Sequence, residues 1–377
     1  MAHSIAPGDE TELATFVADC HANARPLRIA GGGTRIRNAA AAGDTALTTR
    51  QMSGIVTYEP GELTLIVRTG TPIDEITLTL AAEGQAFAFE PMDHRGLLGS
   101  NGVPTIGGMV AGNVSGPCRL RAGACRDHLL GVRFVDGRGR VVKNGGRVMK
   151  NVTGMDLGKL MCGSYGTLGV LTEVALKTLP LAESQKTLAF PSVSVADAVA
   201  IFSTALATPF EVSGAAFHDG TAWLRIEGLS RQVDYRRDQL VTLFRNREID
   251  TLSDARSRDL WRGLRDLSHF AGTADAVWRI LVKPTDAPAT AAALQALGGD
   301  LSLDWGGGLI WYRGSGDAAA VRRGAALGQA MLMRRAADSA FPSPVFPPQS
   351  KGVAQLSQAL RRTFDPAGIF NPGLMDI

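Results

Sequence analysis

Apolar residues in the first 180 positions fall into short runs separated by turn residues, which is the pattern of β-strands. The runs predict strands at 26–30, 55–58, 63–68, 130–135, 140–142 and 170–179. Two segments place apolar residues at helical spacing and predict helices, at 11–24 and 73–82. Asp136-Gly137 between two of the strands is typical of a hairpin turn. This half of the chain is therefore predicted to be rich in strands.

Beyond Pro180 strands and helices alternate. The pattern predicts strands at 211–218, 222–227, 277–282 and 309–313, and helices at 232–244, 287–297 and 318–335. This order favours helices packed on one face of an antiparallel sheet. The proline-rich segment 341–348 must be extended, and it leads to one more helix and a tail. We therefore predict an α+β protein with three parts, at 1–181, 182–340 and 341–377.

Composition narrows the class of protein. Hydrophobic residues make up 45% and charged residues 20%, which is ordinary for a globular chain, and a net charge of +3 is too small to indicate nucleic-acid binding. The four cysteines form no C-x-x-C pair, so no metal site is predicted and reduced thiols in a cytoplasmic protein are expected. No signal-peptide pattern and no uncharged apolar stretch near the ~20 residues of a membrane span is visible.

Glycine is the residue that indicates a ligand. Its 44 copies exceed the usual share, and three clusters stand beside apolar runs, at 31–33, 107–112 and 163–169. Glycine lets backbone N–H groups approach an anion without side-chain obstruction. Three such clusters at strand edges suggest one long ligand, and a dinucleotide is the best candidate. The strand–G-x-G-x-x-G–helix unit of a Rossmann fold is not found.

The clusters belong to longer motifs. These are T-I-G-G-x-x-A-x-N-x-x-G at 105–116, G-S-x-G-T-L-G-V-L-T-E at 163–173 and F-D-P-x-G-I-F-N-P-G at 364–373. With the first glycine turn, they resemble the vanillyl-alcohol-oxidase-like flavoproteins, whose FAD-binding domain is of the p-cresol methylhydroxylase type. The resemblance implies two β-rich subdomains with FAD between them, a smaller domain of antiparallel sheet plus helices, and a tail that returns to the flavin. The pattern at 304–311 is most similar to FAD-binding subunits of glycolate oxidase complexes.

The resemblance also implies which residues hold FAD. The backbone amides expected at the pyrophosphate are those of Gly31, Gly32, Gly33, Thr34 and Arg35. The residues expected along the flavin and diphosphate are Thr105, Gly107, Gly108 and Asn113. Those expected along the ribityl, ribose and adenine are Gly163, Gly166, Thr167, Leu168 and Val170, and Asn371 would close over the flavin. Members that attach FAD covalently carry a histidine where Thr34 stands, so noncovalent binding is expected.

Catalytic residues are not assigned by the sequence. Relatives that oxidise 2-hydroxy acids carry a metal-binding histidine pair and a Glu-His-Gly segment, and none of the six histidines here has that context. His94 could face the flavin as an acid–base group, but an exposed loop position is expected. Lys150, Asn151 and Asp156 could touch phosphate or substrate, and solvated turn residues are expected. The cluster Arg119, Arg121 and Arg126 could form an anion clamp or a solvated face.

The function implied by the resemblance is that of an FAD-binding subunit in a complex that oxidises glycolate or a similar 2-hydroxy acid. The implied partners are a larger FAD-containing hydroxy-acid dehydrogenase subunit and an iron–sulfur subunit, with any membrane association through them. The alternatives are a self-sufficient FAD-dependent dehydrogenase of another small acid or alcohol, and a flavin-binding scaffold without its own chemistry. Because no base is visible and most arginines stand in mixed-charge runs, the chain alone is expected to oxidise glycolate poorly.

Overall fold

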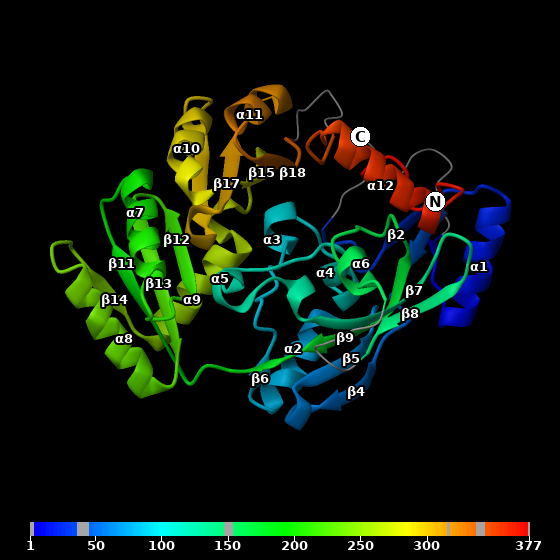
Figure 1. The fold of residues 1–377 in the computed structure, drawn as a ribbon, viewed down its shortest axis with the longest axis horizontal. Helices are drawn as coiled ribbons and strands as arrows, with labels where there is room; N and C mark the ends of the chain where they lie inside the picture. Colours follow the sequence, from blue (N-terminus) through cyan, green and yellow to red (C-terminus); the bar gives the residue numbers. More distant parts are fainter. Residues whose placement is uncertain (1–3, 36–44, 147–153, 315–316, 337–343, 376–377) are drawn as a thin grey trace.

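The computed structural model describes residues 4–35, 45–146, 154–314, 317–336 and 344–375. Figure 1 shows two lobes, with the strands up to β9 in one and strands β11–β18 in the other. Residues of both lobes share one apolar core. For example, Trp305 and Trp311 of the second lobe lie in the same buried cluster as Phe89 and Phe134 of the first. The lobes are therefore packed against each other.

The first lobe begins with a small parallel sheet in the order β1-β3-β2. Its strands are β1 (Ser4–Ile5), β3 (Thr45–Thr48) and β2 (Leu27–Ala30). Helix α1 (Glu10–Ala22) begins after Asp9, whose carboxylate accepts the Glu12 N–H at 2.8 Å. Its apolar stripe of Leu13, Val17 and Cys20 is buried. The helix and β2 confirm the prediction, whereas β1 and β3 were not predicted.

The rest of the first lobe is built on a five-stranded antiparallel sheet in the order β4-β5-β9-β7-β8. Its strands are β4 (Ile55–Glu59), β5 (Thr64–Arg68), β9 (Val170–Lys177), β7 (Leu129–Val135) and β8 (Val141–Gly145). The predicted hairpin β7–β8 is confirmed, and β4 and β5 form another antiparallel pair. The helices between these strands are α2 (Ile73–Ala82), α3 (Arg95–Leu98), α4 (Ile106–Ala111), α5 (Arg119–Ala122) and α6 (Leu157–Met161). A two-stranded piece pairs β6 (Gln85–Ala86) with β10 (Leu179–Pro180).

The second lobe contains one antiparallel sheet of eight strands in the order β14-β11-β13-β12-β16-β17-β15-β18. Its strands are β11 (Ser184–Phe190), β12 (Gly214–His218), β13 (Thr221–Gly228), β14 (Asp250–Leu252), β15 (Ala276–Leu281), β16 (Asp300–Asp304), β17 (Leu309–Gly314) and β18 (Gln329–Arg334). Its helices are α7 (Val195–Leu206), α8 (Ser230–Leu243), α9 (Asp254–Asp266), α10 (Ala287–Gln295) and α11 (Ala318–Gly324). The α+β class predicted from the alternation is confirmed.

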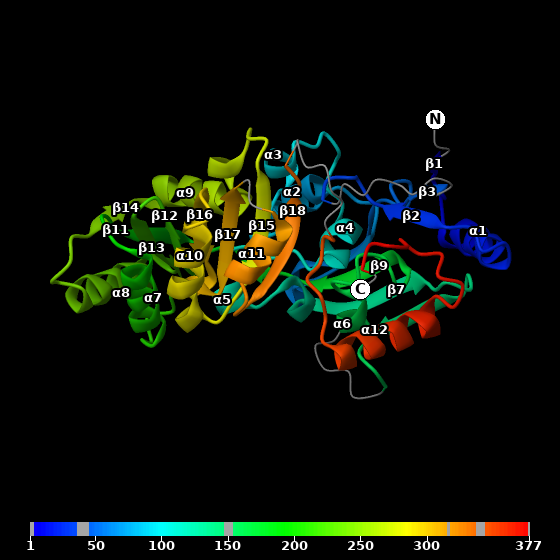
Figure 2. The same cartoon turned by 90° about the horizontal axis from the view of Figure 1, so that it is seen from above.

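Two details of the predicted second lobe are wrong. Figure 2 shows α9 on the side of the sheet opposite to α7, α8, α10 and α11, so the helices do not share one face. Trp261 fixes α9 there, because its indole Nε1 donates to the Thr187 hydroxyl at 2.8 Å. The predicted helix 318–335 ends at Gly324, and its second half is strand β18. The reason is local: a Cβ at Gly328 would lie 2.4 Å from the Leu281 carbonyl oxygen, so the chain passes close enough to β15 to pair with it.

The end of the chain lies against the first lobe. Helix α12 (Lys351–Phe364) ends beside β7, where the rings of Phe364 and Phe134 are 6.1 Å apart. The tail then runs parallel to β2. The Leu27 N–H donates to the Ile369 carbonyl oxygen at 2.7 Å, and the Asn371 N–H to the Leu27 carbonyl oxygen at 2.9 Å. The division at residues 181 and 340 stays a prediction.

Candidate active site: a glycine groove that opens into an arginine cavity

A groove of about 120 Å³ runs between the two sheets of the first lobe. We call it the glycine groove. It is lined by residues 29–35, Thr49, Thr105, Gly107, Gly108, Ala111, Gly112, Tyr165, Gly166, Gly169, Val170 and Leu171. The three glycine clusters of the sequence therefore meet in space, as expected of clusters that serve one ligand.

Steric contacts within the protein explain several of these glycines. A Cβ at Gly32 would lie 1.5 Å from the Val103 carbonyl oxygen, and one at Gly31 would lie 2.2 Å from Thr105 Oγ1. A Cβ at Gly107 would lie 2.6 Å from the Cβ of Thr69. These positions need glycine because segments of the protein cross there. The sequence argument, that glycine clears a path for a ligand, misses this part of the reason.

Other groups in the groove are free for a ligand. The amide N–H groups of Gly32 and Gly33 donate to no acceptor in the described part of the chain. Gly33 has a φ of +70°, and nothing lies within 4 Å of the position where a Cβ would stand. Consecutive unpaired amides in such a turn form a concave anion site. The groove therefore fits the diphosphate of a dinucleotide.

The groove opens into a second cavity of about 270 Å³ between the lobes, which we call the arginine cavity. Arg35, Gly112 and Tyr165 line both spaces. The first lobe also contributes Met92, His94, Leu98 and residues 113–115, and the second contributes Arg279, Trp311 and residues 331–335, with Val345 from the following segment. No aspartate or glutamate is among the described lining residues, so the cavity favours an anion.

Two arginines of this cavity have no counter-ion among the described residues. Neither Arg35 nor Arg279 forms an ion pair there, and Arg279 donates no hydrogen bond to any described residue. Arg35 Nε is buried without a partner. Desolvation lowers the pKa of Arg35 to about 10 and also lowers the pKa of Arg279. Both side chains remain cationic at neutral pH.

His94 is buried, which corrects the expected exposed position: only 6% of its surface is accessible. The loop that carries it packs beneath β18, because Arg334 donates to the carbonyl oxygen of Leu97 in the helix that follows. Nδ1 lies 3.2 Å from the Met92 carbonyl oxygen. Because a carbonyl oxygen only accepts, Nδ1 carries the proton and Nε2 keeps a lone pair. Desolvation, with the charge of Arg35, lowers the pKa of His94 to about 3, so the ring is neutral.

The residues predicted to hold FAD divide into two groups. Ten line the glycine groove, namely Gly31, Gly32, Gly33, Thr34, Arg35, Thr105, Gly107, Gly108, Gly166 and Val170, and Asn113 lines the arginine cavity. Four line neither space: Gly163, Thr167, Leu168 and Asn371. Asn371 instead ties two walls together, because its Oδ1 accepts from the Ile29 N–H at 2.8 Å and its Nδ2 donates to the Tyr165 carbonyl oxygen at 2.9 Å.

The other polar candidates have separate partners. Arg121 pairs with Glu211 at 2.6 Å, Arg126 lies 3.8 Å from Asp127, and Arg119 stacks on Trp305 at 4.3 Å. These three arginines therefore do not converge on one anion. Asp156 caps α6 by accepting the Lys159 N–H at 3.0 Å, and Lys150 and Asn151 lie outside the described residues.

Sequence reasoning missed Arg279 and Tyr165. Arg279 stands in the otherwise apolar strand Ala276–Leu281, and a lone charge in such a strand is a signal that could have been used. Tyr165 lies within the third glycine motif and has a φ of 53°, in the left-handed region. Its burial raises the pKa of the phenol, so it stays protonated.

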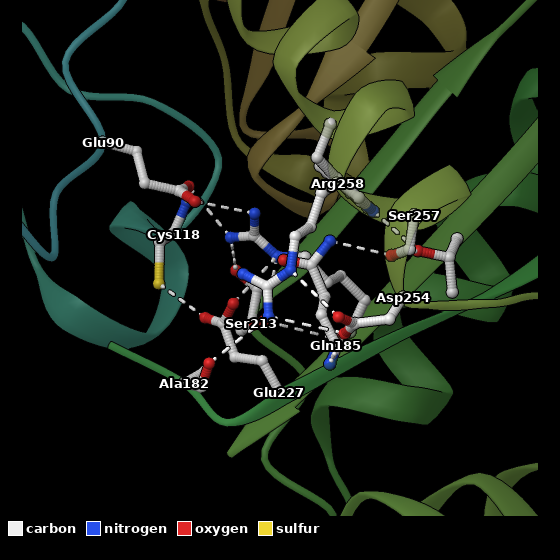
Figure 3. Close-up of polar contacts among 12 residues, drawn as sticks. Glu90, Cys118, Ala182, Gln185, Ser213, Glu227, Asp254, Ser257 and Arg258 are labelled. Atoms are coloured by element: carbon white, nitrogen blue, oxygen red, sulfur yellow. Dashed lines mark hydrogen bonds and ion pairs between the residues drawn. The ribbon is translucent and has the colours of Figure 1, made fainter. Parts of the chain in front are cut away.

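A second arginine centre joins the lobes where Glu90 and Cys118 of the first lobe meet Ser213 of the second (Figure 3). Arg225 of β13, 1% exposed, donates to both carboxylate oxygens of Glu90 at 2.7 and 2.9 Å. Its Nε donates to the Ser213 hydroxyl at 3.0 Å, and its guanidinium stacks on Trp261 at 4.8 Å. Glu90 also accepts the Cys118 N–H at 2.8 Å. Every side of this cation is occupied by protein.

The fold is that of an FAD-binding oxidoreductase, and comparison with known proteins agrees. A family described as FAD binding domain matches residues 1–145. Glycolate oxidase subunit GlcE of Escherichia coli is 34% identical over 93% of this chain and 92% of that protein. The chain therefore belongs to the p-cresol-methylhydroxylase-type family of FAD-binding flavoproteins to which GlcE also belongs, and its cofactor is FAD.

More distant relatives match part of the chain. Glycolate oxidase subunit GlcD of Bacillus subtilis is 29% identical over 49% of this chain and 38% of that protein. D-lactate dehydrogenase of Anaerostipes hadrus is 28% identical over 50% of this chain and 38% of that protein. Alkyldihydroxyacetonephosphate synthase shares the fold, with a TM-score of 0.71 at 15% identity over 98% of this chain and 76% of that chain. None of the described helices has the length and hydropathy to cross a membrane.

Proposed function

We propose that this protein is the FAD-binding subunit of a complex that oxidises glycolate, or a similar 2-hydroxy acid, to the 2-oxo acid. The partners would be a larger FAD-containing hydroxy-acid dehydrogenase subunit and an iron–sulfur subunit, which receive the electrons. We place the complex in the cytoplasm, with any membrane contact made through the partners. The observation that carries the proposal is the glycine groove with unpaired amides, continuous with a cationic cavity between the lobes.

In this proposal FAD binds noncovalently and supplies two-electron redox chemistry. The amides of Gly32 and Gly33 hold the diphosphate, and Thr105, Gly107 and Gly108 form the opposite wall. Gly163, Thr167, Leu168 and Asn371 act by positioning, because they pack behind the walls. Trp311 and Met331 line the arginine cavity on the side of the second lobe.

Noncovalent binding of FAD is tested by acid precipitation of the purified protein. All flavin should appear in the supernatant, because no histidine or cysteine lies at residues 31–35. Yellow colour that stays in the pellet would contradict noncovalent binding. A purified protein without flavin, which also fails to take up added FAD, would overturn the proposed function.

The complex is tested by tagging this chain and isolating what copurifies with it. A flavoprotein and an iron–sulfur protein should appear, and the complex should reduce a dye with glycolate faster than this chain alone. If the isolated chain turned over glycolate at an ordinary enzyme rate, on the order of 10 per second, the self-sufficient dehydrogenase would replace the subunit. The arginine cavity supports the self-sufficient dehydrogenase. The sequence predicted no cationic pocket for the acid, and this was one reason to disfavour that alternative.

A further inference from the structure

We propose that this chain itself binds the acid, with Arg279 anchoring the carboxylate and His94 Nε2 accepting the proton of the hydroxyl group. The inference rests on the proposed function and assigns the substrate site to the arginine cavity. It makes this subunit the place of oxidation. A supporting subunit that only relays electrons would need no such pair.

The surroundings of Arg279 indicate that it binds an anion. It lies opposite Trp311 on β17 and opposite Met331 on β18, and all three side chains line the cavity. Its guanidinium also stacks on Trp305 at 5.2 Å. Aromatic and thioether neighbours hold the side chain but leave its five N–H donors unused. A half-buried, desolvated cation without a partner among the described residues is costly, so the position is best explained by an anionic ligand.

The second observation is the direction of the histidine. The Met92 carbonyl oxygen accepts from Nδ1, and Nε2 accepts no hydrogen bond from a described residue. The neutral ring, which lines the same cavity as Arg279, therefore has a lone pair available at Nε2. A 2-hydroxy acid carries its carboxylate and hydroxyl on neighbouring carbons, so a cation and a proton acceptor in one small cavity match both groups.

The reaction balances with the cofactor already named. His94 Nε2 would accept the hydroxyl proton of the acid, and FAD, when bound, would supply the two-electron oxidant that takes the hydrogen on the same carbon with its electron pair. The carbon–oxygen single bond would become a carbonyl, so the two electrons lost by the acid would equal the two gained by the cofactor. The proton on the histidine then leaves to solvent before the next turnover.

Binding of the carboxylate is tested with the purified FAD-containing chain and oxalate, followed by the visible absorbance of the flavin. Arg279→Met should weaken oxalate binding at least tenfold, and Arg279→Lys should restore part of it. Arg119→Met is the matched control, because Arg119 stacks on the same Trp305 but does not line the cavity. Unchanged binding in Arg279→Met, or an equal loss in both variants, would overturn the assignment.

The proton acceptor is tested with His94→Asn, whose amide can still donate to the Met92 carbonyl oxygen. Oxalate affinity should stay within about twofold, while anaerobic reduction of the flavin by glycolate should slow by about 10²–10⁴-fold. An unchanged rate would remove His94 from the proposal. If the FAD-containing chain bound no oxalate while the complex still oxidised glycolate, this inference would fail and the proposed function would stand.

Discussion

Two arginine centres lie on the sheet of the second lobe, and they differ in what surrounds the charge. Arg225 is paired with Glu90 and Ser213 and covered by Trp261. Arg279 has aromatic and sulfur neighbours but no described carboxylate or hydrogen-bond acceptor. A buried ion pair whose donors are all used is complete without a ligand. A half-buried, desolvated cation such as Arg279 raises the free energy of the empty protein, and the binding of an anion lowers that free energy again. The first centre therefore joins the lobes, and the second serves a ligand.

The largest expected effect comes from breaking the paired centre. Arg225→Met removes a buried cation together with its bonds to Glu90 and Ser213 and leaves the Glu90 carboxylate without its partner, so the free energy of unfolding should fall by about 3 kcal/mol. Denaturant unfolding measures this change. Arg262→Ala is the control, because its ion pair with Asp259 is 64% and 73% exposed and should contribute less than about 0.5 kcal/mol. Equal losses in the two variants would contradict the structural role of Arg225.

The next effect concerns how the free energy of unfolding depends on pH. Its sign should be opposite for His94, which lines the cavity of Arg279, and for Asp304, which lies near Arg225. Desolvation lowers the pKa of His94 to about 3. The contribution of its neutral ring to the stability of the folded protein is therefore present above pH 6.5 and is lost as the pH falls toward 3. Desolvation raises the pKa of Asp304, within electrostatic reach of Arg225, to about 7, so its contribution is lost as the pH rises from 4 to 7.

Each group should therefore change the stability by about 2 kcal/mol between pH 5 and 7.5, in opposite directions. Unfolding of His94→Asn and Asp304→Asn at both pH values tests this. Between pH 7.5 and pH 5, the free energy of unfolding of His94→Asn should rise relative to that of the wild type. Between pH 5 and pH 7.5, the free energy of unfolding of Asp304→Asn should rise relative to that of the wild type. Parallel profiles for all three proteins would show that neither group is held neutral.

A carboxylate placed beside Arg279 should make the second centre resemble the first. Met331 lies directly opposite Arg279 in the antiparallel pair, where Cβ atoms are typically about 5 Å apart. Met331→Glu should pair with the arginine and weaken oxalate binding about tenfold relative to Met331→Gln, which has the same shape without the charge. Equal affinities would show that Arg279 does not hold the anion.

The smallest effect has the opposite sign to the first. Removing the charge in Arg279→Met should raise the free energy of unfolding of the flavin-free protein by about 1 kcal/mol, because a desolvated cation without a described partner is removed. The same denaturant titration as for Arg225→Met measures it. A loss of several kcal/mol would mean that Arg279, like Arg225, supports the fold.

The groove and the cavity also differ in how far the sequence predicts them. The groove is formed by three glycine clusters, and within each cluster the glycines are near neighbours along the chain, so the motifs and most of the lining follow from the sequence. The arginine cavity brings His94, Tyr165 and Arg279 together from three distant segments. The register of β17, β15 and β18 sets Arg279 between Trp311 and Met331. The alanine-rich stretch before β18 predicts a helix, so the sequence pattern does not reveal that strand. Tertiary pairing therefore decides the chemistry that local patterns leave open.

The bridge made by Asn371 has a consequence for how the protein acquires its cofactor. Asn371 lies 342 positions after Ile29, whose N–H it accepts, so a ribosome adds it roughly 15 to 70 s later at usual rates of synthesis. Until then β2 lacks its neighbour at Ile369, and the turn at Tyr165 lacks its amide donor. The glycine groove of the nascent first lobe is thus incomplete, even though nearly all residues of that lobe have been made. The glycine groove is therefore expected to be complete only after Asn371 has been added.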